Sequence, residues 1–230
     1  MATHLITGAG SGIGAALARR LCDRGDELFL LVRNEERGAE LTARLPTSHP
    51  VVADLADPAG LAAALEGQDL PTSLDSVLHV AGVVDLGPMA DLPAEVWRNT
   101  MDVNLLAPAE LTRVLLPALR AARGQVVFVN SGSGLAAHAT WAAYGASKHG
   151  LRALADALRA EEKGTGVRVT SIYPGRVATQ MQRKVHEQEG KDYDPADWID
   201  PESVATTVLT ALDLPRDAEV TDLSVRPAPR

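Results

Sequence analysis

A tyrosine and a lysine four residues apart could carry out proton transfer in this chain. Tyr144 and Lys148 lie in the segment Tyr-Gly-Ala-Ser-Lys, which opens a long stretch of helical period, so both side chains are expected on one helix face. A free phenol has a pKa near 10 and is a poor base at neutral pH. One cation about 4 Å away, at an effective dielectric constant of about 20, contributes roughly 4 kcal/mol, or about three pKa units. The pair is therefore a candidate acid–base centre, although a solvated helix face is the more common reason for such spacing.

A serine upstream could supply a second polar contact for the same reaction. Residues 125–130 form an apolar run that predicts a strand, and Ser131 follows its carboxyl end. Open α/β sheets bind ligands at that edge. The Ser131 hydroxyl is therefore a candidate to bind a carbonyl oxygen on which negative charge develops.

A glycine-rich turn, Thr-Gly-Ala-Gly-Ser-Gly-Ile-Gly, ends the first predicted strand and runs directly into a helix. Gly8 permits a tight turn, Gly12 lets the backbone approach a pyrophosphate, and Gly14 lets helix and strand pack closely. Unpaired N–H groups at the positive end of that helix favour phosphate. The turn predicts a dinucleotide site, and the alternative is a glycine-rich connection without a ligand.

The end of the second predicted strand bears on the choice of dinucleotide. An acidic residue there would accept the ribose hydroxyls of NAD, whereas an arginine pairs with the 2′-phosphate of NADP. This strand has no acid at its tip, and Arg33 follows Val32 directly. A planar guanidinium can grip a phosphate through two hydrogen bonds. The sequence therefore favours NADP(H) over NAD(H), and the alternative is that Arg33 points into solvent and leaves selectivity weak.

Short apolar runs alternate with longer stretches of helical period along the chain. Strands are predicted at residues 4–7, 27–32, 48–53, 76–80, 125–130, 168–173 and 219–224, and helices at 13–23, 34–45, 58–65, 105–121, 141–162 and 201–212. Several strand candidates are continuously apolar, as expected for parallel strands covered on both faces. The pattern predicts an α/β fold of the Rossmann type, a doubly wound parallel sheet of about seven strands with helices on both faces. No linker or repeat interrupts it, so residues 1–230 are expected to form a single domain.

The least regular stretch, residues 178–199, is polar and charged, with Trp198 near its end. Two interpretations remain open at this point. The stretch is either a flap over a substrate site or a solvated surface insertion.

Composition argues against several other functions. The formal net charge is −8 and the basic residues are scattered, which is unlike a nucleic-acid surface. Cys22 is the only cysteine, so no disulfide within the chain and no thiolate metal cluster is expected, and no metal site is predicted. No segment approaches the roughly 20 continuous apolar residues of a membrane span, and the first residues lack a leader pattern. A soluble cytoplasmic protein is expected.

Five motifs, in the right order on the right elements, resemble those of the short-chain dehydrogenase/reductase family, and the resemblance covers nearly the whole chain. The family's T-G-x-x-x-G-x-G turn matches Thr7, Gly8, Gly12 and Gly14, and its Y-x-x-x-K pair matches Tyr144 and Lys148. Its active-site serine falls on Ser131 and its tetrad asparagine on Asn104. Its P-G-x-x-x-T after the sixth strand matches Pro174, Gly175 and Thr179.

The resemblance implies an NADP(H)-dependent oxidoreductase that moves a hydride reversibly between nicotinamide and a carbonyl or alcohol carbon of a small substrate. It implies that Tyr144 donates the proton to the alkoxide in reduction and removes it in oxidation. Lys148 would lower the pKa of that phenol and bind the nicotinamide ribose, and Ser131 would hold the substrate oxygen. Asn104 would support a water relay from Lys148 to solvent.

The resemblance also implies contacts along the cofactor. Asp54 would contact the adenine, the Ile13 N–H the pyrophosphate, and Thr179 with the backbone of Val177 the carboxamide. The expected cofactor-binding residues are Gly8, Ser11, Gly12, Ile13, Gly14, Arg33, Asp54, Leu55, Ala81, Gly82, Tyr144, Lys148, Pro174, Gly175, Val177 and Thr179.

The chain departs from the family pattern at three places. His79-Val80-Ala81-Gly82 replaces the usual N-N-A-G; His79 is interpreted as a structural histidine, and another group must replace the hydrogen bonds of the second Asn. Ser11 stands where many NADP-using relatives have a basic residue. The C-terminus lacks a glycine-rich ending, which leaves homodimer and homotetramer both open.

The expected substrate-binding residues are Ser131, Tyr144, His138 and Trp141, the last two with packing as the alternative. A small carbonyl or alcohol compound is the expected partner, with no nucleic acid and no membrane. Two other functions remain: an NAD-dependent alcohol dehydrogenase, and a non-catalytic NADP sensor, which would have little reason to retain four catalytic residues.

Overall fold

The parallel sheet predicted from the sequence is present in the computed structural model, which describes residues 1–228; the last two residues of the predicted domain lie outside the described part. In that part, seven parallel strands form one sheet in the order β3-β2-β1-β4-β5-β6-β7. The strands are β1 (Thr3–Thr7), β2 (Glu27–Val32), β3 (Ser48–Val52), β4 (Ser76–His79), β5 (Gln125–Val129), β6 (Arg168–Pro174) and β7 (Asp222–Val225). The order reverses between β1 and β4, and ligands of doubly wound sheets bind at the carboxyl ends of the strands beside that point.

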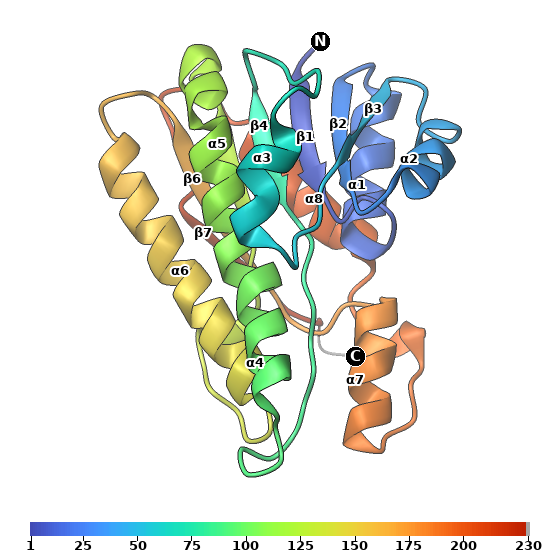
Figure 1. Ribbon diagram of the computed structural model, residues 1–230. Helices are drawn as coiled ribbons and strands as arrows, with labels where there is room; N and C mark the ends of the chain where they lie inside the picture. Colours follow the sequence, from blue (N-terminus) through green and yellow to red (C-terminus); the bar gives the residue numbers. More distant parts are fainter. Residues whose placement is uncertain (229–230) are drawn as a thin grey trace.

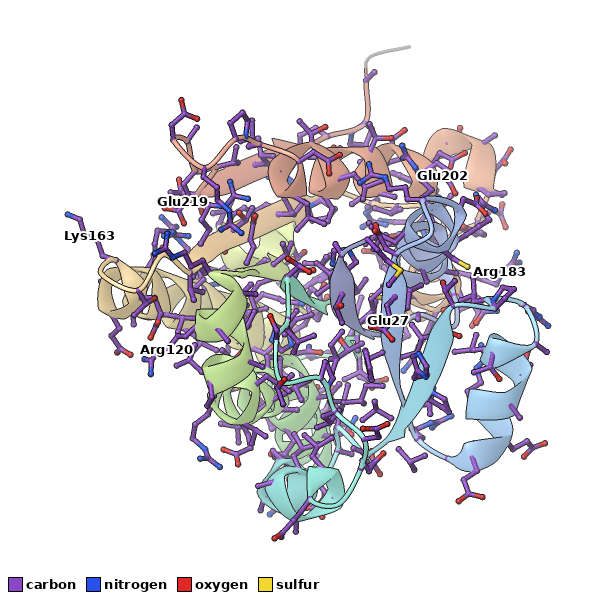
Figure 2. The ribbon with its side chains drawn as sticks, turned by 90° about the horizontal axis from the view of Figure 1, so that it is seen from above. Glu27, Arg120, Lys163, Arg183, Glu202 and Glu219 are labelled. Atoms are coloured by element: carbon purple, nitrogen blue, oxygen red, sulfur yellow. The ribbon has the colours of Figure 1, made fainter. Side chains whose placement is uncertain are left out.

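Helices cover both faces of the sheet (Figure 1). They are α1 (Gly12–Asp23), α2 (Glu35–Thr42), α3 (Leu61–Leu65), α4 (Ala94–Met101), α5 (Ala107–Ala122), α6 (Ala142–Glu162), α7 (Gln180–Glu189) and α8 (Pro201–Leu212). Neighbouring strand residues point to opposite faces, so Leu5 packs with α3, α5 and α6 while Ile6 packs with α1, α2 and α8. Seen from above, the two helical layers enclose the strands, and charged side chains such as Lys163 point outward (Figure 2).

Three details differ from the sequence prediction. β7 begins at Asp222 instead of residue 219, because the side chain of Glu219, not its backbone, accepts a hydrogen bond from the Val169 N–H. α4 was not predicted. The irregular stretch 178–199 contains a full helix, α7, followed by a short 3₁₀ turn at Pro195–Asp197. No helix in the described part of the chain combines the length and the apolar character needed to cross a membrane.

At the end of β4, His79-Val80-Ala81-Gly82 departs from the family pattern, and the side chains of Thr7 and Thr112 form hydrogen bonds with this segment. The hydroxyl of Thr7 accepts hydrogen bonds from the N–H groups of Val80 and Ala81 at 3.0 and 3.1 Å and so ties the segment after β4 to β1. His79 is fully buried, stacks on Phe128 and pairs with the Thr112 hydroxyl at 2.8 Å. Burial lowers the pKa of His79 to about 3, so the ring is neutral. The structural interpretation of His79 is thereby supported.

Candidate functional site

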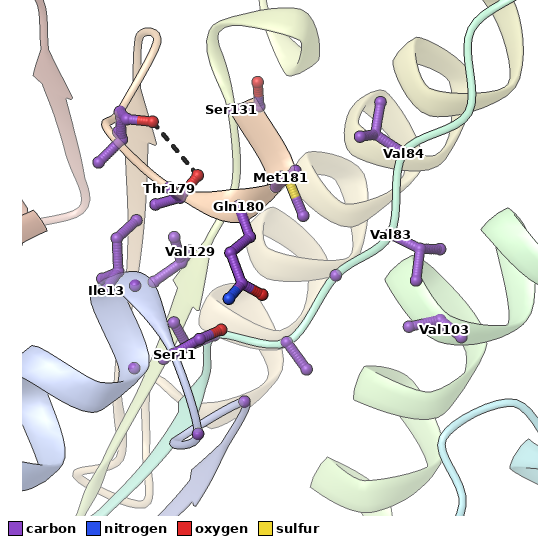
Figure 3. A pocket seen from close by; sticks show the side chains of 18 of the residues that line it. Ser11, Ile13, Val83, Val84, Val103, Val129, Ser131, Thr179, Gln180 and Met181 are labelled. Atoms are coloured by element: carbon purple, nitrogen blue, oxygen red, sulfur yellow. Dashed lines mark hydrogen bonds between the residues drawn. The ribbon is translucent and has the colours of Figure 1, made fainter. Parts of the chain in front are cut away.

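One cavity of about 1290 Å³ runs along the carboxyl edge of the sheet and contains nearly all the residues predicted for cofactor and substrate. Figure 3 shows Gln180 and Met181 between Ser11 on one side and Val83 and Val103 on the other. The predicted residues that line the cavity are Gly8, Ser11, Gly12, Ile13, Gly14, Arg33, Asp54, Leu55, Ala81, Gly82, Ser131, His138, Trp141, Tyr144, Lys148, Pro174, Gly175, Val177 and Thr179. Typical small-molecule sites occupy about 300–1,000 Å³, so this cavity has room for a dinucleotide and a second small molecule.

The glycine turn between β1 and α1 forms a cradle at one end of the cavity. Gly8 and Gly12 adopt left-handed backbone conformations, with φ of 73° and 52°, and a Cβ on Gly14 would overlap the Gly8 carbonyl oxygen. Ser11 occupies the N-cap of α1 but makes no side-chain capping bond, so the first N–H groups of the helix remain available for an anion. A Cβ on Gly12 would lie 2.9 Å from Cγ2 of Thr179, the residue whose hydroxyl caps α7.

Two arginines follow β2, one of which the sequence analysis missed. Arg33 lines the cavity as predicted. Arg37, in the first turn of α2, lines it too, and its guanidinium donates to the Gly10 carbonyl oxygen at 2.8 Å. Its place in the first turn of the helix that follows β2 was the signal that could have identified it. Arg37 also pairs with Glu40, so its charge is partly compensated.

Ser131 and Tyr144 meet in the middle of the cavity. Ser131 follows β5, and its hydroxyl accepts a hydrogen bond from the Ser133 N–H at 3.1 Å. Burial raises the pKa of the Tyr144 phenol, while a hydrogen bond with the Ser131 hydroxyl opposes that shift. The Lys148 ammonium lies 5.8 Å from the centre of the tyrosine ring, and the lowering of the phenol pKa expected from it stays a prediction.

Lys148 is a buried cation with spare donors. Its ammonium donates to the Val129 carbonyl oxygen at 3.1 Å, and its side chain is 3 % exposed. Burial lowers the pKa of Lys148 to about 8. An ammonium has three N–H groups, and in the described structure only one of them has a protein acceptor. The remaining donors fit the hydroxyl groups of a ribose bound against this wall.

Asn104 is the one predicted site residue that does not line the cavity. It lies in a turn of π-helix, Asp102–Leu106, between α4 and α5. Its amide accepts from the Val83 N–H at 2.8 Å and donates to the Val83 carbonyl at 2.9 Å and to the Ser147 hydroxyl at 3.1 Å. The contact seen is thus a brace on the cavity wall, one residue beyond Gly82 and beside the helix that carries Tyr144.

The end of the cavity beyond Tyr144 is mostly apolar. Val84, Val185 and Tyr144 form a buried cluster, against which Trp141 and Met181 pack. Trp141 meets the Tyr144 ring edge-on at 5.7 Å. His138, by contrast, lies on an exposed loop at the rim. Three residues that line the cavity were not predicted from the sequence: Met181 on α7, Arg176 and Arg226.

Comparison with known proteins bears out the resemblance seen in the motifs. The pattern of the short chain dehydrogenase family matches residues 2–190. A short-chain type dehydrogenase/reductase of Sinorhizobium fredii is 35 % identical over 228 residues, covering 97 % of this chain and 90 % of that protein. Among solved structures, a serine dehydrogenase complexed with NADP⁺ superposes with a TM-score of 0.85 at 26 % identity, over 97 % of this chain and 94 % of that one. A 4-hydroxyisoleucine dehydrogenase complexed with NADH superposes with a TM-score of 0.81 at 25 % identity, over 99 % and 97 % of the two chains.

These matches span most of each chain, and they agree with the fold described above. The chain therefore belongs to the short-chain dehydrogenase/reductase family, and it is an oxidoreductase that acts on CH–OH or C=O groups with a nicotinamide cofactor.

Proposed function

We propose that this enzyme prefers NADP(H) and interconverts a carbonyl compound and its alcohol, with Tyr144 as the acid–base group. The observation that carries the proposal is the single cavity that joins the glycine cradle and its two arginines to Ser131, Tyr144 and Lys148. When bound, the nicotinamide supplies a hydride for reduction and accepts one in oxidation.

The residues of the chain handle the oxygen and the proton. In reduction, the carbonyl π electrons move onto the oxygen, which the Ser131 and Tyr144 hydroxyls meet as hydrogen-bond donors. Tyr144 gives its proton to that oxygen and completes the alcohol; in oxidation it takes the proton back. A protonated Lys148 nearby favours the phenolate form of Tyr144, and its spare N–H groups hold the ribose. Asn104 keeps the wall at Val83 in place, and a water relay from Lys148 to solvent would begin beside it.

The preference for NADP(H) rests on Arg33 and Arg37. No acidic residue ends β2, and both guanidinium groups line the cavity where an adenosine 2′-phosphate is expected. Glu36 and Glu40 line the same end, but Glu40 already pairs with Arg37 and Arg44. The two solved relatives described above bind NADP⁺ and NADH, so the fold accepts either cofactor and these local charges decide.

The test is a set of assays with NADPH and NADH on a panel of ketones, aldehydes, quinones and hydroxysteroids. Tyr144→Phe should lower kcat at least ~10²-fold, because the proton donor is lost, while NADPH binding measured by fluorescence stays unchanged.

Arg33→Ala should raise the KM for NADPH about tenfold and leave the KM for NADH unchanged, because only NADPH carries the 2′-phosphate that the guanidinium binds. Arg98→Ala, an exposed arginine on α4, serves as the matched control.

Substantial turnover by Tyr144→Phe would contradict the role given to the phenol. Equal losses of NADPH and NADH in Arg33→Ala, or a wild-type preference for NADH, would instead identify an NAD-dependent alcohol dehydrogenase. Cofactor binding with no turnover of any compound would favour the sensor.

A further inference from the structure

Arg226 follows β7 and is one of the residues that line the cavity. Its guanidinium packs on Gly132, directly after Ser131, so closely that a Cβ on Gly132 would overlap it. Its side-chain stem passes Gly175, where a Cβ would lie 3.7 Å from the Arg226 Cδ. Two glycines from different elements thus leave the space that this side chain fills. The arginine is held against the wall of the catalytic cavity although much of it is exposed.

Arg226 has no acidic partner in residues 1–228. No hydrogen bond or ion pair to its side chain is present there, in contrast to most arginines of the chain. An exposed arginine usually gains little from one fixed position, because long side chains lose rotamer entropy when they are ordered. A guanidinium that is held in place beside Ser131 without an acidic partner therefore indicates a ligand that supplies the negative charge.

The other charges at this end of the cavity are already compensated. Arg176 makes a bidentate pair with Glu189 at 2.6 and 2.9 Å and lies over the rings of Trp141 and Trp198. Hydrogen bonds from Arg176 hold the pKa of Glu189 below its usual range, so this carboxylate is ionised, and Lys191 contacts it as well. The Glu189 charge is therefore neutralised locally, and Arg226 contributes a positive charge that has no acidic partner among residues 1–228.

The apolar wall at this end of the cavity limits the kind of ligand that could also reach Arg226. Tyr144, Val84 and Val185 form the apolar part of the wall, with Trp141 and Met181 against them. A ligand that fills this end must place its reacting carbon at Ser131 and Tyr144, a short apolar portion along the valines, and an anionic oxygen group at Arg226. A guanidinium binds carboxylate and phosphate oxygens through two parallel hydrogen bonds.

We propose that Arg226 makes this enzyme specific for carbonyl or alcohol compounds that carry an anionic group, a carboxylate or a phosphate ester, near the reacting carbon. The inference deepens the proposed function and rests on it for the chemistry, in which hydride and proton add to the carbonyl of the anionic substrate as described above. Arg226 acts as a specificity-determining residue and takes no part in the proton transfer.

The experiment compares pairs of ketones that share the reacting carbonyl and differ in charge: 4-oxopentanoate with its methyl ester, and dihydroxyacetone phosphate with dihydroxyacetone, each with NADPH. We expect wild-type kcat/KM to be about tenfold or more higher for the anionic member of at least one pair. Arg226→Met should lower that value at least tenfold, mainly through KM, and leave the neutral member within twofold. Arg226→Lys should recover part of the effect, because it keeps the charge but loses the planar fork. Arg98→Met, on the exposed face of α4, should change neither value.

Binding of pentanoate, which has no carbonyl to reduce, to the NADP⁺ complex gives a second readout by calorimetry. Pentanoate should bind the wild type and Arg98→Met and fail to bind Arg226→Met. Reduction of both members of each pair with equal efficiency, together with no Arg226-dependent pentanoate binding, would overturn the inference and leave the proposed function standing. Pentanoate binding that depends on Arg226 without reduction of any ketone would support the anion site and count against the proposed function.

Discussion

At the scale of single residues, the sequence predicts where Tyr144 and Lys148 lie but not how burial shifts their pKa values. The sequence places Tyr144 and Lys148 on one helix face, and they do share it. Their ionisation depends on burial, which no spacing rule contains. The phenol pKa rises and the ammonium pKa falls to about 8, because both groups are removed from water by walls contributed by distant segments.

Lys148 should make the stability of the cofactor-free protein depend on alkaline pH. Its folded-state pKa of about 8 lies below the ordinary value of 10.5, so the unfolded chain binds the proton more tightly. The resulting penalty, up to about 3 kcal/mol, is full below pH 8 and disappears as pH rises toward 10.5. Between pH 7 and pH 10 the free energy of unfolding of the wild type should therefore rise by about 2 kcal/mol relative to Lys148→Met. Urea denaturation at both pH values measures it, and parallel changes in the two proteins would contradict a charged, buried Lys148.

The residues that the sequence did not reveal are those brought in by long-range pairing. Arg226 reaches Gly132 only because β7 pairs with β6, beside β5, whose end carries Ser131. No local pattern contains that proximity. Arg37 could have been identified from the sequence, because it lies in the first turn of the predicted helix that follows Arg33. Thr7, Ser131 and Pro174 were predictable because they lie at or directly after the carboxyl ends of strands, where a parallel sheet brings residues together.

At the scale of elements, the strands were predicted well, whereas the helices α4 and α7 were not. β2 and β5 read as nearly continuous apolar runs because helices cover both faces of the sheet. α7 carries mostly polar side chains, and Val185 is its one fully buried apolar residue. Its signals were its ends: the Thr179 side chain caps the start and Gly190, in a left-handed conformation, closes the end. The prediction that residues 178–199 act as a substrate flap stays a prediction; the stretch contains α7, whose Lys184 forms an ion pair with Asp85.

Asn104, in the π-helical turn between α4 and α5, holds the backbone of Val83 through its side-chain amide. Asn104→Ala would leave both polar backbone groups of Val83 without their partner in a site where Asn104 is 1 % exposed. The free energy of unfolding should fall by about 2–3 kcal/mol, the range for buried groups that lose their hydrogen bonds. Asn99→Ala, on the exposed face of α4, should change it by less than about 0.5 kcal/mol. Thermal or urea denaturation of both variants checks this, and similar small effects would show that the brace is dispensable.

At the scale of the whole molecule, the buried histidine under the cofactor end should set part of the acid stability. The folded-state pKa of His79, about 3, lies below the ordinary 6.5, so the unfolded chain takes up a proton first as pH falls. The stability that depends on a neutral His79 is complete above pH 6.5 and is lost progressively below it, amounting to about 2 kcal/mol at pH 5.

The matched variant is His79→Gln, which can keep a hydrogen bond to Thr112 but does not titrate. Between pH 7 and pH 5, the wild type should lose about 2 kcal/mol more of its free energy of unfolding than His79→Gln. His4, whose pKa is also lowered by burial, is common to both proteins and cancels in the comparison. Equal acid sensitivity in the two proteins would place the titration elsewhere.

The contact between Gly12 and Thr179 has a kinetic meaning. The turn expected to hold the pyrophosphate touches the residue from which α7 starts, and α7 in turn forms one wall of the apolar end. Binding of the pyrophosphate in the glycine turn should therefore fix the position of Thr179, from which α7 and the apolar end of the cavity begin. We expect steady-state kinetics to show compulsory-order binding, in which the dinucleotide binds first and leaves last. The small substrate would then find its part of the cavity fully formed only after the dinucleotide has bound.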